Sequence, residues 1–99
     1  MYAVIFKAEI NELTDKDADL YTQMAKELRK LAMQKYSCVE FNSVLQGNHE
    51  ITISYWESLE HIQHWKQDYK HLIAQEFGRI KAYKSYKVQV VEIIREYTN

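Results

Sequence analysis

The 99-residue sequence contains no proline and only two glycines, so few positions favour a sharp turn or a break in regular structure. Long linkers without secondary structure are therefore not expected, and the sequence indicates one domain over residues 1–99. A chain of this length buries roughly 60–70% of the surface of its unfolded form, which is enough for one core.

The sequence also has only one cysteine and almost no net charge. The lone Cys38 excludes an internal disulfide, which is typical of a reducing compartment. Thirteen basic against fourteen acidic residues, with no basic stripe, argue against a nucleic-acid partner. The segment MYAVIFKAEI carries Lys7 and Glu9 and lacks a long apolar run, so neither a signal peptide nor a membrane span is expected. We expect a cytoplasmic protein without a membrane partner.

What the sequence does contain is alternating and helical periodicity in a regular order. Alternation predicts strands over residues 2–10, 38–45 and 51–56, with a hairpin turn at 46–49. A long β-prone run with apolar residues on both faces predicts a fourth strand over residues 83–97. Spacings of three and four predict one helix from about residue 14 to 36 and a second from Ser58, its N-cap, to Gly78. The second helix is expected to bury one continuous stripe formed by Ile62, Trp65, Tyr69, Leu72 and Ile73.

This order predicts an α+β protein with a ferredoxin-like βαββαβ fold, in which two helices cover one face of a four-stranded antiparallel sheet. The other face would then expose Ala3, Ile5, Val44 and half of the last strand. An apolar face of this kind is uncommon on a monomer. We therefore expect a homodimer in which two copies pack through this sheet face, with the last strand reaching across.

The second helix carries three histidines within eleven residues, His61, His64 and His71. On one continuous helix, His64 and His71 would point away from the apolar stripe, beside Glu60 and Asp68, so metal binding is not expected. His61 would lie at the edge of the stripe and could reach the rim of a pocket.

Motifs for familiar chemistry are missing. The sequence contains no G-x-S-x-G, no P-loop and no G-x-G-x-x-G, and Cys38 is expected to be a small buried residue. Eight tyrosines and two tryptophans suit an interface or a pocket for a flat ligand. Trp56 and Trp65 have two open interpretations: core packing, or walls of an aromatic cavity between helices and sheet.

The stretches ITISYWES-x-E-x-I-x-x-W-K and AQEFGRIKAYKSYKVQVVEIIREY resemble the antibiotic biosynthesis monooxygenase family. The likeness also includes the opening Y-A-V-I-F-K and Cys38 with Phe41. It implies a dimeric α+β barrel. Some members of the family oxidise phenols or quinols with O2 and no cofactor, others degrade haem, and many have no established activity.

The two branches match this sequence differently. The haem-degrading branch resembles it at Trp65, but Phe6 and Gln75 stand where that branch has asparagine and histidine, so haem degradation is disfavoured. The polyketide-tailoring branch resembles it at Trp56, but Thr52 and Ile62 stand where that branch has asparagine and tyrosine.

The resemblance implies a cofactor-independent monooxygenase that acts with O2 on a small aromatic substrate, either a phenol, a quinol or a polyketide-like ring. His61 would be the base, Trp65 would be a wall of the cavity, and Trp56 would be either a wall or an indole N–H donor. The substrate-binding candidates are Phe6, Tyr69, Tyr83 and Tyr86. The alternative is a non-catalytic dimer that binds a small aromatic ligand.

Overall fold

A computed structural model describes residues 1–99, apart from the side chain of Tyr69. Its elements are β1 (Tyr2–Ile10), α1 (Asp15–Gln34), β2 (Glu40–Gln46), β3 (His49–Trp56), α2 (Leu59–Gln67), α3 (Tyr69–Phe77), the π-helical turn η1 (Gly78–Ala82) and β4 (Tyr83–Glu92). The four strands form one antiparallel sheet in the order β2-β3-β1-β4. The predicted ferredoxin-like fold is confirmed.

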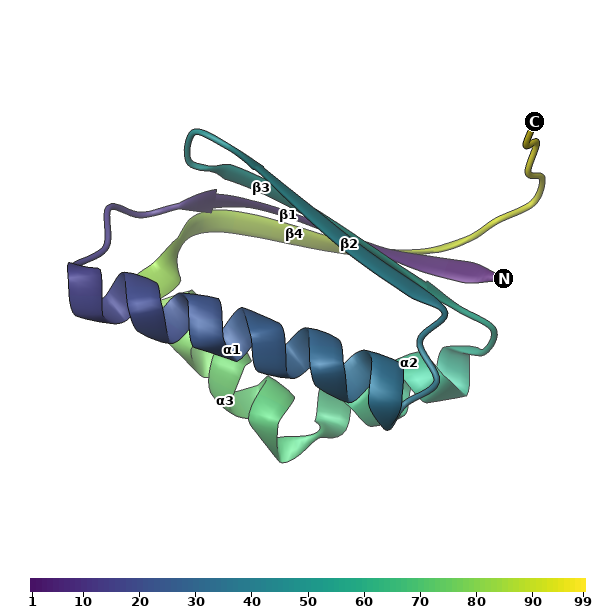
Figure 1. Cartoon of the computed structure of the whole chain (residues 1–99), viewed down its shortest axis with the longest axis horizontal. Coiled ribbons are helices and arrows are strands. Elements are labelled where there is room, and N and C mark those ends of the chain that lie inside the picture. The colour runs from purple at the N-terminus through teal and green to yellow at the C-terminus, as the bar shows by residue number, and fades with distance from the viewer.

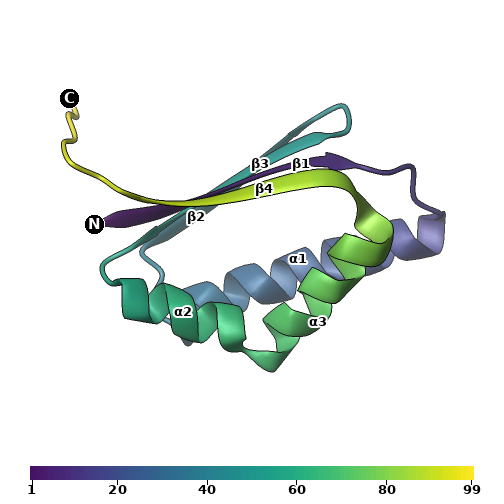
Figure 2. The ribbon, with the colours of Figure 1, turned by 180° about the vertical axis from the view of Figure 1, so that it is seen from behind.

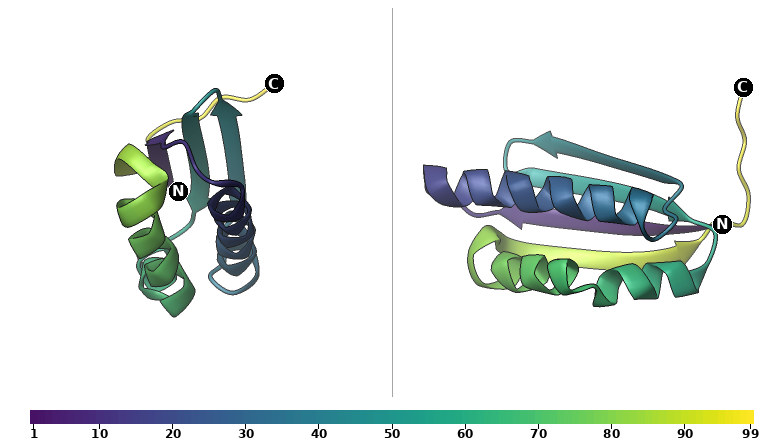
Figure 3. Two further views of the ribbon diagram at one scale, coloured as in Figure 1. Left: turned by 90° about the vertical axis from the view of Figure 1, so that its left-hand side faces the viewer. Right: turned by 60° about the horizontal axis from the view of Figure 1, so that its bottom comes forward.

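The molecule has two layers. All helical segments lie on one face of the sheet, with α1 in front of α2 and α3 in Figure 1 and behind them in Figure 2. Seen end-on in Figure 3, α1 and the α2–α3 pair form two columns below the sheet. The opposite face carries no helix, as the sequence predicted. No described helix is long and apolar enough to cross a bilayer.

Local capping explains where α1 begins and ends. The Thr14 side chain accepts a hydrogen bond from the Asp17 backbone N–H at 3.2 Å, which satisfies one of the free donors of the first turn. Beyond Gln34 the chain turns sharply at Ser37, which has φ 61°. The β2–β3 hairpin turns at Gly47, which has φ 62°, and its flanking residues Gln46 and His49 are paired. The hairpin prediction is confirmed.

The prediction of one continuous second helix is wrong, because the helix breaks at Asp68. This residue is extended (φ −61°, ψ 141°) and separates α2 from α3. One of its carboxylate oxygens caps α3 by accepting from the Lys70 backbone N–H at 2.9 Å. The other accepts from the Tyr36 hydroxyl at 2.6 Å and lies 3.6 Å from Lys35 Nζ. The end of α1 therefore holds the break in place.

The break divides the predicted apolar stripe. Ile62 and Trp65 are buried as expected, whereas Leu72 and Ile73 are exposed because α3 starts in a new direction. The Tyr69 side chain, predicted to bind substrate, lies outside what the structure describes. The last strand also ends earlier than predicted, at Glu92, and the tail that follows leaves the sheet with Ile94 and Tyr97 exposed (Figure 1).

Candidate functional site

The helix-facing side of the sheet divides into two halves along the strands. Directly paired residues of neighbouring strands share a face, so the register assigns each side chain. We define the tryptophan half as Tyr2, Val4, Phe41, Ser54, Trp56 and Val90. We define the glutamate half as Phe6, Ala8, Ser43, Leu45, Glu50, Thr52, Tyr86 and Val88.

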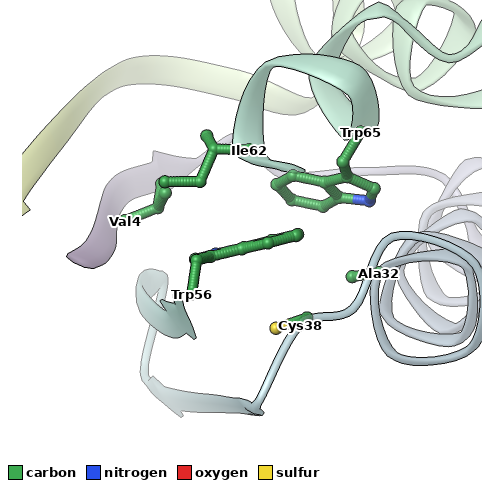
Figure 4. Packing of buried hydrophobic residues seen from close by; sticks show 6 residues of the cluster. All are labelled: Val4, Ala32, Cys38, Trp56, Ile62 and Trp65. Atoms are coloured by element: carbon green, nitrogen blue, oxygen red, sulfur yellow. The ribbon is translucent and has the colours of Figure 1, made fainter. Parts of the chain in front are cut away.

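The tryptophan half is closely packed. Trp56 from β3 and Trp65 from α2 lie with their ring centroids 5.2 Å apart and their planes tilted by 37°. Val4, Ile62, Ala32 and Cys38 surround them, as Figure 4 shows. The tryptophan half therefore forms the hydrophobic core of the domain, and both tryptophans pack in it.

Both indole N–H groups are already used inside the core. Trp56 Nε1 donates to Ser54 Oγ at 2.9 Å, and Trp65 Nε1 donates to the Leu28 carbonyl at 3.2 Å. A buried indole N–H without a partner would cost about 1–3 kcal/mol, so these bonds support the packing. A ligand could receive a bond from Trp56 only if Ser54 released it.

Cys38 belongs to the same core and is a buried residue, as the sequence predicted. Its Sγ lies 3.2 Å from the Glu40 carbonyl and 3.4 Å from the Tyr55 carbonyl. Burial raises the pKa of the Cys38 thiol above its ordinary value, so the reactive thiolate is disfavoured.

At the glutamate half, Glu50 belongs to a hydrogen-bonded chain of three polar side chains that come from three elements. The Tyr21 hydroxyl on α1 donates to Glu50 Oε2 on β3 at 2.8 Å. The same hydroxyl lies 3.0 Å from the Tyr83 hydroxyl at the start of β4. All three side chains are half-buried between the helices and the sheet.

Burial shifts the titration of this chain. Desolvation raises the pKa of the Glu50 carboxyl, and the hydrogen bond from Tyr21 only partly opposes that rise. Burial also raises the pKa of Tyr83 to about 12 and raises the pKa of Tyr21 well above its usual range. A half-buried carboxylate with a raised pKa and specific hydroxyl partners is typical of groups that exchange protons in a functional site.

An aromatic wall stands beside the carboxylate. The ring centroids of Phe6 and Tyr83 are 5.3 Å apart, those of Tyr83 and Tyr86 are 5.6 Å apart, and those of Phe6 and Tyr86 are 6.1 Å apart. Gly78 makes room for this wall, because a Cβ at that position would lie 2.8 Å from Cδ2 of the Tyr83 ring. The absence of a side chain at Gly78 therefore positions Tyr83.

The wall is open to solvent along the edge strand β4. Tyr86, Val88 and Val90 face the helical layer, yet they are 45%, 43% and 45% exposed. The helices therefore leave the inner face of β4 partly uncovered, and a small flat molecule can approach Phe6 and Tyr86 from this side.

Two hollows also lie on the helical layer itself. One, of about 190 Å³, lies between α1 and α3 and is lined by Leu20, Gln23, Met24, Glu27, Leu28, Lys70 and Ile73. The other, of about 290 Å³, is lined by Ile73, Glu76, Phe77, Ile80 and Lys81. Both linings combine apolar side chains with charged ones, and neither contains any of the predicted site residues.

The histidines occupy the opposite end of the layer from the tyrosine chain. His61 lies in the first turn of α2, where its backbone N–H donates to Ser58 Oγ at 3.2 Å. That turn follows Trp56, which pairs with Tyr2, whereas Tyr83 pairs with Ile10 at the other end of β1. At about 3.3 Å per residue, these two ends are roughly 26 Å apart.

His71 does not point outward as predicted. Its ring packs edge-on against Trp65 with centroids 4.4 Å apart, because the break at Asp68 reorients α3. Burial lowers the pKa of His71, so the neutral form is favoured. His64 is exposed, as predicted, and lies 3.9 Å from Glu60. Among the described side chains, no three His, Cys, Asp or Glu residues gather in a metal-binding arrangement.

The structure thus brings some predicted site residues together and separates others. Phe6, Tyr83 and Tyr86 form one cluster, and Trp56 and Trp65 form another. His61 is not brought to the tyrosines. Sequence reasoning assigned no role to Tyr21 or Glu50. The spacing from Trp56 could have identified Glu50, because residues separated by six positions on a strand lie on the same face of the sheet.

Comparison with known proteins agrees with this architecture. No protein-family model matches the sequence. The chain is 34% identical over 96 residues to the uncharacterized protein YqjZ of Bacillus subtilis, and the match covers 96% of this chain and 81% of YqjZ.

Two solved structures share the fold at low identity. One is an antibiotic biosynthesis monooxygenase, with a TM-score of 0.77, 13% identity and coverage of 96% of this chain and 100% of that one. The other is a variant of SnoaB, a cofactor-independent oxygenase from Streptomyces nogalater, with a TM-score of 0.79, 7% identity and coverage of 99% and 97%. The chain belongs to the same family as YqjZ, and its fold is that of the antibiotic biosynthesis monooxygenases.

Proposed function

We propose that this protein is a cofactor-independent monooxygenase that oxidises a small phenol or quinol with O2. The observation that carries the proposal is the glutamate half, where the aromatic wall of Phe6, Tyr83 and Tyr86 stands beside the hydroxyl-bonded carboxylate of Glu50. The fold shared with SnoaB supports the cofactor-free route.

The reaction needs three things from the protein: a flat apolar wall, a proton acceptor and donors for oxygen-centred charge. The phenol loses its hydroxyl proton, and the anion transfers one electron to O2. The resulting radical pair combines at a ring carbon that carries hydrogen, giving a peroxide that takes up one proton. Loss of that hydrogen and cleavage of the O–O bond yield a quinone and water, so one substrate and one O2 give one quinone and one H2O.

The test is O2 uptake with a panel of quinols and anthrone-like phenols in the presence of a chelator. Uptake above the protein-free background supports the proposal, and we expect Tyr86→Ala to reduce it because this change removes an exposed part of the wall. Tyr97→Ala, in the exposed tail, is the matched control. His61→Ala tests the base that the family resemblance implied, and unchanged turnover would remove His61 from the mechanism.

The second candidate is a dimer that binds a small aromatic ligand without chemistry. It is favoured because the chain lacks the residues that both branches of the similar family use. Phe6 and Gln75 stand at the positions of the haem-degrading branch, and Thr52 and Ile62 stand at those of the polyketide-tailoring branch. Quenching of tryptophan fluorescence by a quinol, with no O2 uptake from any member of the panel, would favour this candidate.

We also propose that two copies pair through the sheet face that carries no helix. Ile5, Ile53, Tyr55 and Val91 lie near one another on this face, because β1 pairs with both β3 and β4 there. Val44 and Ile51 extend the apolar area toward the hairpin and are 65% and 38% exposed. A second copy of the same sheet covers such a surface with a self-complementary partner.

Sedimentation equilibrium tests the pairing at micromolar protein concentration. We expect a dimer for the native sequence and a monomer for Ile51→Glu, which places a charge on the proposed interface. Ile80→Glu is the control, because Ile80 is 62% exposed on η1, on the helical layer. A native protein that sediments as a monomer contradicts the proposal.

A further inference from the structure

We propose that Tyr83, Tyr21 and Glu50 form a proton relay that takes the hydroxyl proton of a phenolic substrate bound against Phe6 and Tyr86, with Glu50 as the final acceptor. This inference rests on the proposed function and assigns the proton acceptor that it requires. It places that acceptor at the Ile10 end of β1, away from His61.

The direction of the relay follows from counting hydrogens. The Tyr21 hydroxyl carries one hydrogen and donates it to Glu50 Oε2 at 2.8 Å. At the 3.0 Å contact between the two hydroxyls, Tyr83 must therefore be the donor and Tyr21 the acceptor. The Tyr83 oxygen keeps lone pairs that can accept a hydrogen bond, and they lie at the end of the chain next to the aromatic wall.

Glu50 suits the role of final acceptor because its surroundings are not those of a structural ion pair. Its neighbours across the sheet are Ala8 and Leu45, which carry no charge. From α1 it meets Tyr21, and among the described side chains no lysine, arginine or histidine forms an ion pair with it. Burial raises the pKa of Glu50, which makes the carboxylate a stronger base than an exposed one.

Three hydrogens move in the proposed step. The substrate hydroxyl gives its proton to the Tyr83 oxygen, Tyr83 gives its own to the Tyr21 oxygen, and Tyr21 gives its own to Glu50 Oε2. Each tyrosine stays neutral, Glu50 becomes a neutral carboxylic acid, and the substrate becomes a phenolate. The relay then runs backwards when the peroxide anion takes up a proton, which restores the Glu50 carboxylate.

The acceptor also narrows the substrate class. An ordinary phenol has a pKa of about 10 and a carboxyl group a pKa of about 4, and each unit of difference lowers the ionised fraction tenfold. The raised pKa of Glu50 reduces the difference between the pKa of the carboxyl group and that of the phenol, but the pKa of the phenol must also be lower for the proton to be transferred. The relay therefore fits a phenol that is made more acidic by a carbonyl group conjugated with its ring.

The test uses 4-hydroxybenzaldehyde, a phenol with a conjugated carbonyl whose neutral and ionised forms absorb at different wavelengths. The protein is titrated into the probe about one pH unit below the free probe's pKa, where most of the free probe is neutral. We expect the native protein to bind the probe as the phenolate. Glu50→Gln should bind it mainly as the neutral phenol, with the ionised fraction about tenfold lower, equivalent to one pKa unit.

Two further variants separate the relay from a merely structural role. Tyr21→Phe breaks the chain in the middle while leaving Glu50 and Tyr83 in place, and it should also leave the bound probe neutral. Glu12→Gln removes an exposed carboxylate in the β1–α1 loop and should bind the probe as the native protein does. Unfolding curves show which variants are folded, and only folded variants are compared. A loss of probe ionisation in Glu50→Gln or Tyr21→Phe is then not caused by unfolding.

In the probe titration three results overturn the relay: a native protein that does not bind the probe, a native protein that binds it only in the neutral form, or a Glu50→Gln variant that ionises it as the native protein does. The result for O2 uptake is separate. Equal uptake of O2 by the native protein and Glu50→Gln would refute the relay and leave the monooxygenase proposal intact. Ionisation of the probe without O2 uptake from any quinol would leave the relay intact and refute the monooxygenase.

Discussion

Tyr21 and Glu50 are 29 residues apart in sequence, and the hydrogen bond between them joins the N-terminal half of α1 to the sheet. The bond has an ionised acceptor, which makes it stronger than a bond between neutral groups. It lies in the half of the inner face that lacks the tryptophan core. Tyr21 therefore contributes to holding the helical layer in place as well as to the polar chain.

Replacing Tyr21 with Phe should lower the free energy of unfolding by about 1–2 kcal/mol, because a half-buried carboxylate loses its hydroxyl donor. The difference in unfolding free energy between the two proteins should shrink as pH falls through the raised pKa of Glu50. Once the carboxyl group is protonated, it has no negative charge for the Tyr21 hydroxyl to stabilise. Urea unfolding at several pH values measures both effects. Tyr97→Phe, in the exposed tail, should unfold as the native protein does; a constant deficit across pH would contradict the assignment.

His71 should make the protein less stable in mild acid. An unburied histidine has a pKa of 6.5, and in the folded protein burial against Trp65 lowers the pKa of His71 below that value. The unfolded chain therefore binds a proton at His71 more readily than the folded protein does. The stabilisation is present above about pH 6.5 and is lost as pH falls below that value, with a slope of at most about 1.4 kcal/mol per pH unit. Thermal unfolding between neutral and mildly acidic pH measures this loss.

The matched variant for that measurement is His71→Gln, which keeps a polar side chain but does not titrate. Asp68 and Lys66 lie near His71 and have opposite effects on its pKa, so neither is changed. The difference in melting temperature between the two proteins should narrow as pH falls. A constant difference would show that His71 has the same pKa in the folded and unfolded chain.

A side chain at Gly78 should disturb the aromatic wall. In Gly78→Ala the new Cβ would overlap the Tyr83 ring, so either the ring or η1 must move. We expect a loss of about 1–3 kcal/mol, as for other overpacking changes, and an altered near-UV circular dichroism spectrum from the tyrosines. Gly47→Asn is the control, because Gly47 needs a positive φ, which Asn tolerates, and no atom lies within 4 Å of the added Cβ.

The two tryptophans should be coupled optically as well as by packing. Their rings lie 5.2 Å apart with the planes tilted by 37°, a geometry that gives an exciton couplet in circular dichroism. Trp56→Phe or Trp65→Phe should each abolish the couplet and cost about 1–3 kcal/mol. Alanine at either position would cost about 3–5 kcal/mol, a large share of the stability of a domain this size, so phenylalanine is the informative change. A couplet that survives either change would contradict the packing.

Much of the fold could be predicted because its signals are local. The alternation over residues 2–10, the Ser58 cap and the Gly47 turn each indicate one element without reference to the rest of the chain. The break at Asp68 could not be predicted in the same way. The helical spacing of Ile62, Trp65 and Tyr69 continues across it, and the groups that favour the break, Tyr36 and Lys35, lie at the end of another helix.

The candidate site was harder to predict because its members come from three elements. Phe6, Tyr83 and Tyr86 were identified as aromatic candidates, and the register of β1 with β4 brings them together. Tyr21 lies three residues before Met24 and seven before Leu28, on the apolar side of its helix, but only the helix packing shows that its hydroxyl contacts Glu50. His71 was predicted on the wrong side for the same reason as Leu72, since one break changes the direction of all later side chains.

The division of the inner face into two halves has a consequence for how new chemistry can arise in this scaffold. On each strand every second residue faces the helices, and the residues packed in the core lie toward one end of the strand while those of the proposed site lie toward the other. Substitutions at Phe6, Thr52, Tyr86 or Val88 leave the indole pair untouched. These four positions can therefore be varied while the packed core stays constant, which makes them the natural targets for a combinatorial library that tests the proposed site.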